Sequence, residues 1–109
     1  MATTYKVLGQ VQPSANTQTT AYTVPSATQA VISTIVVSNL GPTATTYRIA
    51  IQPAGASLIQ KHYIAYDISV PALDSIAFTL GVTLATTDVI SVMSFSGLVN
   101  FNIFGSEIA

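Results

Sequence analysis

The chain of 109 residues contains no cysteine, no tryptophan and only one histidine. Without cysteine, neither a disulfide framework nor a thiolate-bound metal site is possible. A single histidine also excludes the usual zinc sites, and no Asp-x-Asp-x-Asp loop for calcium occurs in the sequence. We therefore expect no cofactor and no metal, and a fold that does not depend on an oxidising compartment.

Charged side chains are scarce. They make up 6% of the residues, and the formal net charge is −1, whereas about 25% is typical of a soluble domain. The polar surface must therefore consist mostly of Thr, Ser, Gln and Asn. Low charge gives little electrostatic repulsion, and the cores of protein interfaces are depleted of charge. We favour a subunit whose surface is covered in an assembly over a monomer with a hydroxyl-rich coat.

The sequence gives little support for a nucleic-acid or membrane partner. Lys6, Arg48 and Lys61 are dispersed, while binding to a phosphate backbone needs several neutralising contacts. The longest apolar stretches, such as Val31–Leu40, are interrupted by Ser and Thr. They are also shorter than the ~20 residues of a spanning helix. The N-terminus has neither a basic start nor an apolar stretch, so we expect no secretory signal peptide.

Short β-branched segments bounded by Pro, Gly, Asn or Ser recur along the chain, and helical periodicity is almost absent. This pattern predicts about eight strands: Thr4–Gly9, Thr19–Val24, Gln29–Asn39, Thr45–Gln52, His62–Val70, Ser75–Leu80, Val89–Phe95 and Leu98–Phe104. They predict one all-β domain over residues 1–109, an antiparallel two-sheet sandwich. Periodicity does not choose between jelly-roll and immunoglobulin-like connectivity. Residues 1–12 are expected to form an N-terminal arm or an edge strand.

Alternation within the strands predicts which side chains face the core. In His62–Val70, one side carries Ile64, Tyr66, Ile68 and Val70, which we expect to be buried. Tyr63 has the opposite parity in that strand, and Phe104 has the opposite parity in Leu98–Phe104. Exposed apolar side chains mark contact surfaces. The candidate assembly contacts are Tyr5, Leu58, Ile59, Tyr63 and Phe104.

No constellation of catalytic side chains is apparent, so we expect no enzyme and name no catalytic residue. His62 is the only possible imidazole base, and its position at a strand entrance indicates a solvated loop-end residue. The four acids are spread along the chain: Asp67, Asp74, Asp88 and Glu107. Asp74 and Asp88 fall in turns, where aspartate commonly accepts hydrogen bonds from local backbone amides. Asp67 is expected to pair with Lys61 or Arg48 at the surface.

Several short motifs between Thr4 and Ile108 carry a family resemblance. They are Pro13-Ser14-Ala15, Ala21-Tyr22-Thr23-Val24-Pro25, Val36-Val37-Ser38-Asn39-Leu40-Gly41, Tyr47-Arg48-Ile49-Ala50, Pro53-Ala54-Gly55-Ala56, His62-Tyr63-Ile64-Ala65-Tyr66-Asp67 and Asn102-Ile103-Phe104-Gly105. Through these motifs the chain resembles a group of small β-sandwich virion proteins of tailed bacteriophages. The resemblance implies a non-enzymatic part of the particle, and it carries over no site residues.

Within that resemblance we expect a capsid decoration (cement) protein, a class that sits on the outer shell as small oligomers, often trimers, and bridges capsid subunits. The implied partners are the major capsid protein and further copies of this chain. The implied location is the virion, assembled in the host cytoplasm. Residues 1–12 would add a strand to a neighbour. The alternatives are a phage neck, tail or fibre-associated module, and a host-glycan-binding, lectin-like domain that uses Tyr63 and the loop around Leu58.

Overall fold

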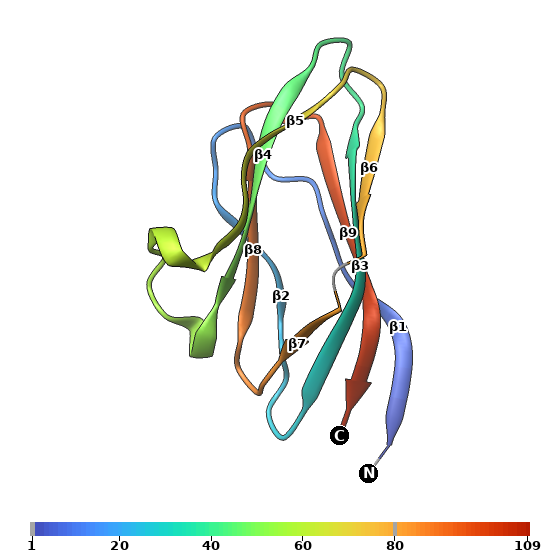
Figure 1. Cartoon of the computed structure of the whole chain (residues 1–109), viewed down its shortest axis with the longest axis vertical. Helices are drawn as coiled ribbons and strands as arrows, with labels where there is room; N and C mark the ends of the chain where they lie inside the picture. Colours follow the sequence, from blue (N-terminus) through green and yellow to red (C-terminus); the bar gives the residue numbers. More distant parts are fainter. Residues whose placement is uncertain (1, 80) are drawn as a thin grey trace.

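Two antiparallel sheets pack face to face in the computed structural model, which describes residues 2–79 and 81–109 (Figure 1). The strands are β1 (Thr3–Val11), β2 (Thr19–Thr23), β3 (Gln29–Asn39), β4 (Thr45–Gln52), β5 (Tyr63–Val70), β6 (Ser75–Phe78), β7 (Val82–Leu84), β8 (Val89–Ser94) and β9 (Val99–Ile108). Two short 3-10 turns, η1 (Pro53–Gly55) and η2 (Gln60–His62), lie between β4 and β5. The predicted all-β, two-sheet sandwich is confirmed.

The strand order is that of a jelly roll. Sheet A has the order β1-β9-β3-β6, with β7 also on β3, and sheet B has the order β2-β8-β4-β5. The first strand thus pairs with the last, β2 pairs with β8, β3 pairs with β6 and β7, and β4 pairs with β5. A long hairpin rolled onto itself produces this nested pairing. Of the two connectivities that the sequence left open, the structure has the jelly roll.

Most strand boundaries agree with the prediction, and the differences lie at the ends of the strands. The predicted bounds of β3 and β4 are correct, whereas β9 continues past Phe104 to Ile108. The strand β7 was not predicted, because three residues give no readable alternation. It continues the pairing of β6 along β3. The predicted strand end at Leu80 and the residue Met1 lie outside the described residues.

The core fills the space between the two sheets. In β9, the alternation of buried Val99, Phe101 and Ile103 with half-exposed Asn100 and Asn102 is the one predicted. Tyr47 of sheet B reaches across to sheet A. Its ring lies edge-on to Phe101 and to Phe78, with 6.0 Å between ring centroids in each case. Such aromatic contacts add to the stabilisation from buried area, so this cluster joins the sheets.

The prediction of which β5 side chains are buried was largely wrong. Val70 is buried, but Ile64, Tyr66 and Ile68 are 40% to 49% exposed, and Ala65 occupies the core instead. The strand lies at the edge of sheet B, where fewer neighbours cover its side chains.

A bulge explains why Tyr66 faces outward, whereas Ile68, opposite buried Tyr47, keeps the predicted side and is exposed at the sheet edge. Ile68 pairs with Tyr47 and Ala65 pairs with Ile49, so Tyr66 and Asp67 together face Arg48. Asp67 has a φ of 54°, the left-handed backbone conformation. An extra residue in one strand reverses the inward and outward sides beyond it. A second irregularity follows between Ile49 and Ala50.

Tyr47 provides a test of the core. Its hydroxyl is buried, and no protein group among the described residues forms a hydrogen bond with it. Burial raises the pKa of Tyr47 to about 12, so the group remains a neutral donor at ordinary pH. Removing an unpaired buried hydroxyl should be neutral or favourable. We therefore expect Tyr47→Phe to unfold in urea at the wild-type midpoint or above it, and a loss of more than about 1 kcal/mol would contradict this account.

Candidate assembly surfaces

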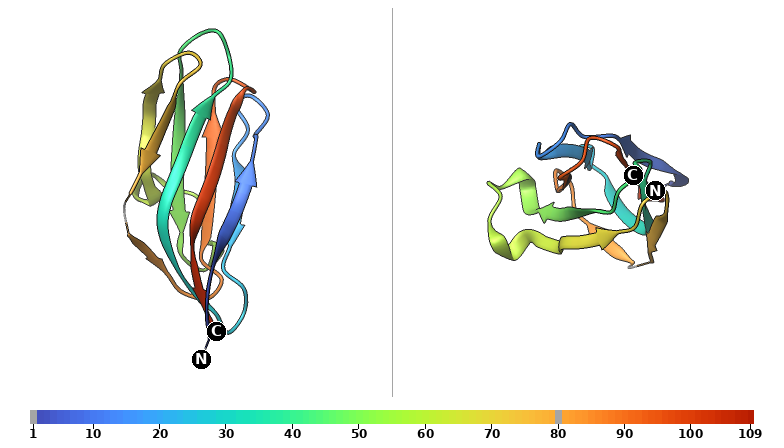
Figure 2. Two further views of the ribbon diagram at one scale, coloured as in Figure 1. Left: turned by 90° about the vertical axis from the view of Figure 1, so that its right-hand side faces the viewer. Right: turned by 90° about the horizontal axis from the view of Figure 1, so that it is seen from above.

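The solvent side of sheet A carries no charged side chain among the described residues, and we call it the uncharged face. It turns toward the viewer in the left panel of Figure 2, with β3, β9 and β1 side by side. The strand registers place these residues on it: Thr3, Tyr5, Val7, Gln10, Gln29, Val31, Thr34, Val36, Ser38, Ser75, Ala77, Thr83, Asn100, Asn102, Phe104, Ser106 and Ile108. Charge depletion over a whole sheet face is typical of surfaces that other proteins cover.

The part of the uncharged face nearest the chain termini is apolar. A shallow hollow of about 600 Å³ lies there, with walls that include Tyr5, Val7, Val31 and Phe104. Lys6 also lines this hollow, but its amine is paired with Glu107. Tyr5 is 83% exposed, and Val7 is also exposed. The structure thus brings two of the predicted contacts, Tyr5 and Phe104, to one hollow. The apolar side chains there would gain free energy if a partner removed them from water.

Farther from the termini, the uncharged face carries amide side chains. Gln10 donates from Nε2 to Asn102 Oδ1 at 2.8 Å, and Gln12 donates to the carbonyl of Gly97 at 3.0 Å. A second hollow, of about 300 Å³, has Asn100 in its lining beside these groups. Amides both donate and accept hydrogen bonds. The face therefore offers apolar contact at one end and directional, uncharged hydrogen bonding at the other.

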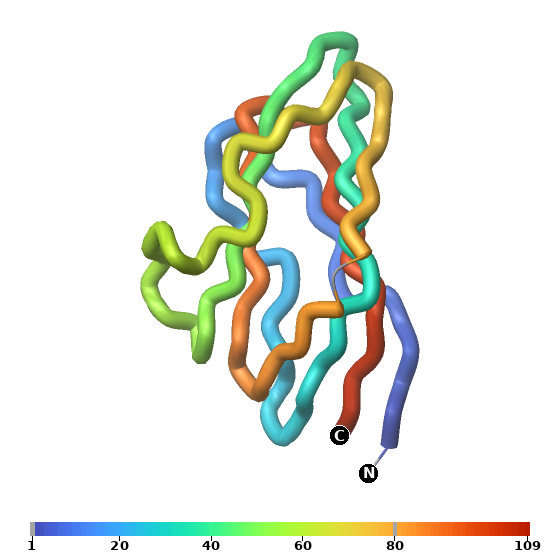
Figure 3. Tube along the Cα trace, in the orientation of Figure 1, coloured from blue at the N-terminus to red at the C-terminus, as the bar shows by residue number. Residues whose placement is uncertain are grey.

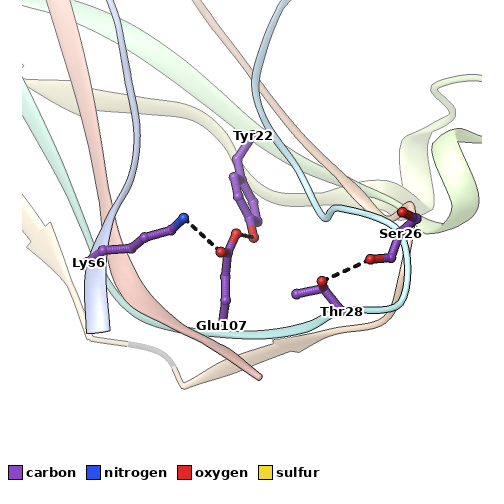
Figure 4. Close-up of polar contacts among 5 residues, drawn as sticks. All are labelled: Lys6, Tyr22, Ser26, Thr28 and Glu107. Carbon is purple, nitrogen blue, oxygen red and sulfur yellow. Dashed lines mark hydrogen bonds and ion pairs between the residues drawn. The ribbon is translucent and has the colours of Figure 1, made fainter. Parts of the chain in front are cut away.

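The charges carried by the strands of sheet A point away from the uncharged face. Lys6 of β1 forms an ion pair with Glu107 of β9, with 2.7 Å between Nζ and Oε1 (Figure 4). The hydroxyl of Tyr22, from β2 of sheet B, donates to the other carboxylate oxygen at 2.6 Å. The three side chains link the two sheets. The hydrogen bonds from Lys6 and Tyr22 lower the pKa of Glu107, while burial and Glu107 raise the pKa of Tyr22.

The link should make stability depend on pH. The folded pKa of Glu107 lies below its ordinary value of 4.5. Its stabilisation is therefore complete above about pH 4.5 and is lost as the pH falls through the folded pKa. We expect Glu107→Gln to lose about 1–2 kcal/mol at pH 7, and the difference from wild type to shrink toward pH 3. Urea unfolding across this range measures it, and a pH-independent difference would contradict the assignment.

The outer side of sheet B holds a cluster of Arg48, Tyr63, Tyr66, Asp67 and Phe95, which we call the arginine–aromatic cluster. Arg48 donates from Nε and Nη2 to the two carboxylate oxygens of Asp67, at 2.6 and 3.2 Å. Its guanidinium carbon lies 4.1 Å from the ring centre of Tyr66 and 5.2 Å from that of Phe95. The hydrogen bond to Asp67 raises the pKa of Arg48. The predicted pairing of Asp67 is confirmed, with Arg48 as the partner.

The five predicted contacts do not form one patch. Tyr5 and Phe104 lie on sheet A. Tyr63 lies on β5 of sheet B, and Leu58 and Ile59 lie in the loop that joins β4 to β5. That loop, residues 53–62, projects from the body of the molecule (Figure 3). Ile59 is exposed there, and Leu58 is half-buried. The aromatic partner of Tyr63, Tyr66, was missed because it was expected in the core. Phe95 joins the cluster through Arg48.

Two local predictions about polar residues had different outcomes. His62 was expected in solvent, but it is buried. Its Nδ1 accepts the backbone N–H of Ile59 at 3.2 Å, and this hydrogen bond closes the η2 turn. The turn roles of Asp74 and Asp88 are confirmed. Asp74 accepts the N–H of Ser75, and Asp88 accepts the N–H groups of Ala85 and Ala54.

Over residues 2–79 and 81–109, no three His, Asp or Glu side chains lie together as metal ligands would. Within the same ranges no helix has the length and apolar character needed to cross a bilayer. Comparison with known protein families, with curated proteins and with solved structures finds no significant match to this chain.

Proposed function

We propose that this chain is a non-enzymatic structural protein of a bacteriophage virion, a capsid decoration protein that binds the outer shell and bridges its subunits. The uncharged face is the observation that carries the proposal. In the proposed assembly this face contacts the major capsid protein, and further copies of the chain complete a small oligomer, of which a trimer is one form. The resemblance of the sequence to small phage virion proteins points the same way.

The dimensions of the face suit such a contact. Three strands of 9 to 11 residues lie side by side, and β6 and β7 follow one another along the outer side of β3. At a strand spacing of about 4.8 Å, they give a footprint of roughly 600 Å². One partner in a standard interface buries about 800 Å² of accessible surface. Because side chains make a sheet face uneven, its accessible area exceeds its footprint. Docking through sheet A would therefore bury most of the accessible surface that one partner contributes to a standard interface.

Physical chemistry also explains why a shell partner would benefit. A decoration protein adds buried area across the joints between capsid subunits, and this requires no reaction and no bound cofactor. Apolar contacts in the hollow around Phe104 would contribute about 25 cal/mol per Å² removed from water. The amides near Gln10 would fix the orientation through hydrogen bonds. In this proposal the arrangement of Tyr5, Phe104 and the amides replaces the charge pairs that many interfaces use.

Copy number tests the proposal. Purified phage particles that contain the chain would be digested, and the chain would be quantified against the major capsid protein by mass spectrometry with labelled standards. A decoration protein should reach hundreds of copies per particle, in a fixed ratio to the shell protein. A few copies, or a few dozen, would contradict decoration and would assign the chain to the neck, tail or fibre.

A further inference from the structure

The arginine–aromatic cluster borders a cavity on the side of the molecule opposite the uncharged face. The cavity measures about 300 Å³ and is lined by Gln60, Tyr63 and Tyr66. The two tyrosine rings lie edge to face, with 4.9 Å between centroids. Tyr66 is about half exposed although it is aromatic. Exposed aromatic side chains that hold one another in place around a cavity form a ready contact surface for a small ligand.

The polar groups at this cavity are suited to hydroxyl groups. Gln60 supplies an amide, which both donates and accepts, and each tyrosine supplies a phenol hydroxyl. Next to them, Arg48 has five N–H donors, of which the contact with Asp67 uses the Nε hydrogen and one on Nη2. Asp67 is itself partly exposed, with 41% of its side chain accessible. The lining of the cavity therefore offers one amide and two phenol hydroxyls, and the Arg48–Asp67 pair lies beside Tyr66.

From this arrangement we infer a binding site for a single neutral pyranose ring, lined by Gln60, Tyr63 and Tyr66. The negative face of an aromatic ring attracts the weakly positive C–H groups on one side of a sugar ring. The hydroxyls of the sugar meet the amide of Gln60 and the outer edge of the Arg48–Asp67 pair.

Charge and size set the class of ligand. The charges of Arg48 and Asp67 cancel, so the site favours a neutral sugar over a phosphorylated or carboxylated one. A volume of 300 Å³ is at the lower limit for ligand pockets, which fits one ring of an oligosaccharide. The site lies on sheet B and does not rest on the proposed function of sheet A.

Saturation-transfer NMR tests this site with the methyl glycosides of glucose, galactose, mannose and N-acetylglucosamine. Each probe would be used at about 10 mM, which detects dissociation constants in the millimolar range. We expect transfer to at least one probe. Gln60→Ala, an exposed position that adds no core packing, should reduce its affinity about fivefold, and Tyr66→Ala should reduce it further.

The controls distinguish binding at this site from nonspecific binding. Tyr5→Ala removes the most exposed tyrosine, which lies on the opposite sheet, and should leave binding unchanged. Circular dichroism of each variant verifies that it is folded. The inference is overturned if none of the four probes shows transfer, if Gln60→Ala and Tyr66→Ala both bind like wild type, or if Tyr5→Ala weakens binding equally. None of these results would alter the copy number that tests the decoration proposal.

Discussion

Gly105→Ala should destabilise the fold by about 3 kcal/mol, because no room exists for a methyl group at this position. A Cβ there would overlap the carbonyl oxygen of Val31 and would lie 3.1 Å from the Cα of Ile32. Both contacts are backbone atoms of β3, the strand that pairs with β9. They cannot move aside without breaking the centre of sheet A. Urea unfolding measured by fluorescence or circular dichroism gives the free energy directly.

Gly97→Ala is the matched control for this prediction. A Cβ at Gly97 would meet the backbone nitrogen of Ala15 at 3.6 Å, an ordinary contact. We expect a change within about 0.5 kcal/mol for this variant. Gly9→Ala should behave like Gly105→Ala, since its Cβ would overlap the carbonyl oxygen of Ala21. Equal stability of the Gly105→Ala and Gly97→Ala variants would show that β3 and β9 are not packed as described.

Val7→Lys should reduce binding to capsid shells at least tenfold while leaving the fold intact. Val7 is exposed beside the hollow of the uncharged face, so a lysine there remains hydrated in the free protein. In the proposed complex its charge would be buried without a partner, which costs several kcal/mol. Co-sedimentation with shells that lack the chain, over a range of concentrations, gives the two affinities.

Ser69→Lys provides the comparison, because Ser69 is exposed on β5, an edge strand of sheet B. It adds the same charge to the same kind of position on the opposite sheet. We expect this variant to bind shells like wild type, and both variants to unfold within about 0.5 kcal/mol of it. If Ser69→Lys abolished binding and Val7→Lys did not, sheet B rather than sheet A would carry the contact.

Local patterns in the sequence were sufficient to predict most strands and several polar contacts. The turn residues that bound Gln29–Asn39 and Thr45–Gln52 located both strands at the correct residues, since proline, glycine and asparagine interrupt pairing by local chemistry. The Arg48–Asp67 pair could also be predicted from the sequence, because the two side chains lie on the polar sides of neighbouring strands. These features depend on residues close in the chain or on adjacent strands.

Features that depend on long-range strand pairing could not be predicted from the sequence. The jelly-roll order joins β1 to β9, strands from opposite ends of the chain. Without that pairing, Lys6 and Glu107 could not be recognised as partners that point inward, and the absence of charge on one sheet face could not be seen. The bulge at Asp67 had the same effect locally, since one unpaired residue turned Tyr66 from an expected core residue into the centre of a surface cluster.

Hydroxyl-radical footprinting of the free and the particle-bound protein tests most directly whether sheet A is the covered surface. Tyr5 and Phe104 report on the uncharged face, while Tyr66 and Phe95, which are also solvent-accessible, report on sheet B. We predict that particle binding protects Tyr5 and Phe104 from oxidation and leaves Tyr66 and Phe95 as reactive as before. Unchanged oxidation of Tyr5 on the particle, or protection confined to Tyr66 and Phe95, would contradict it.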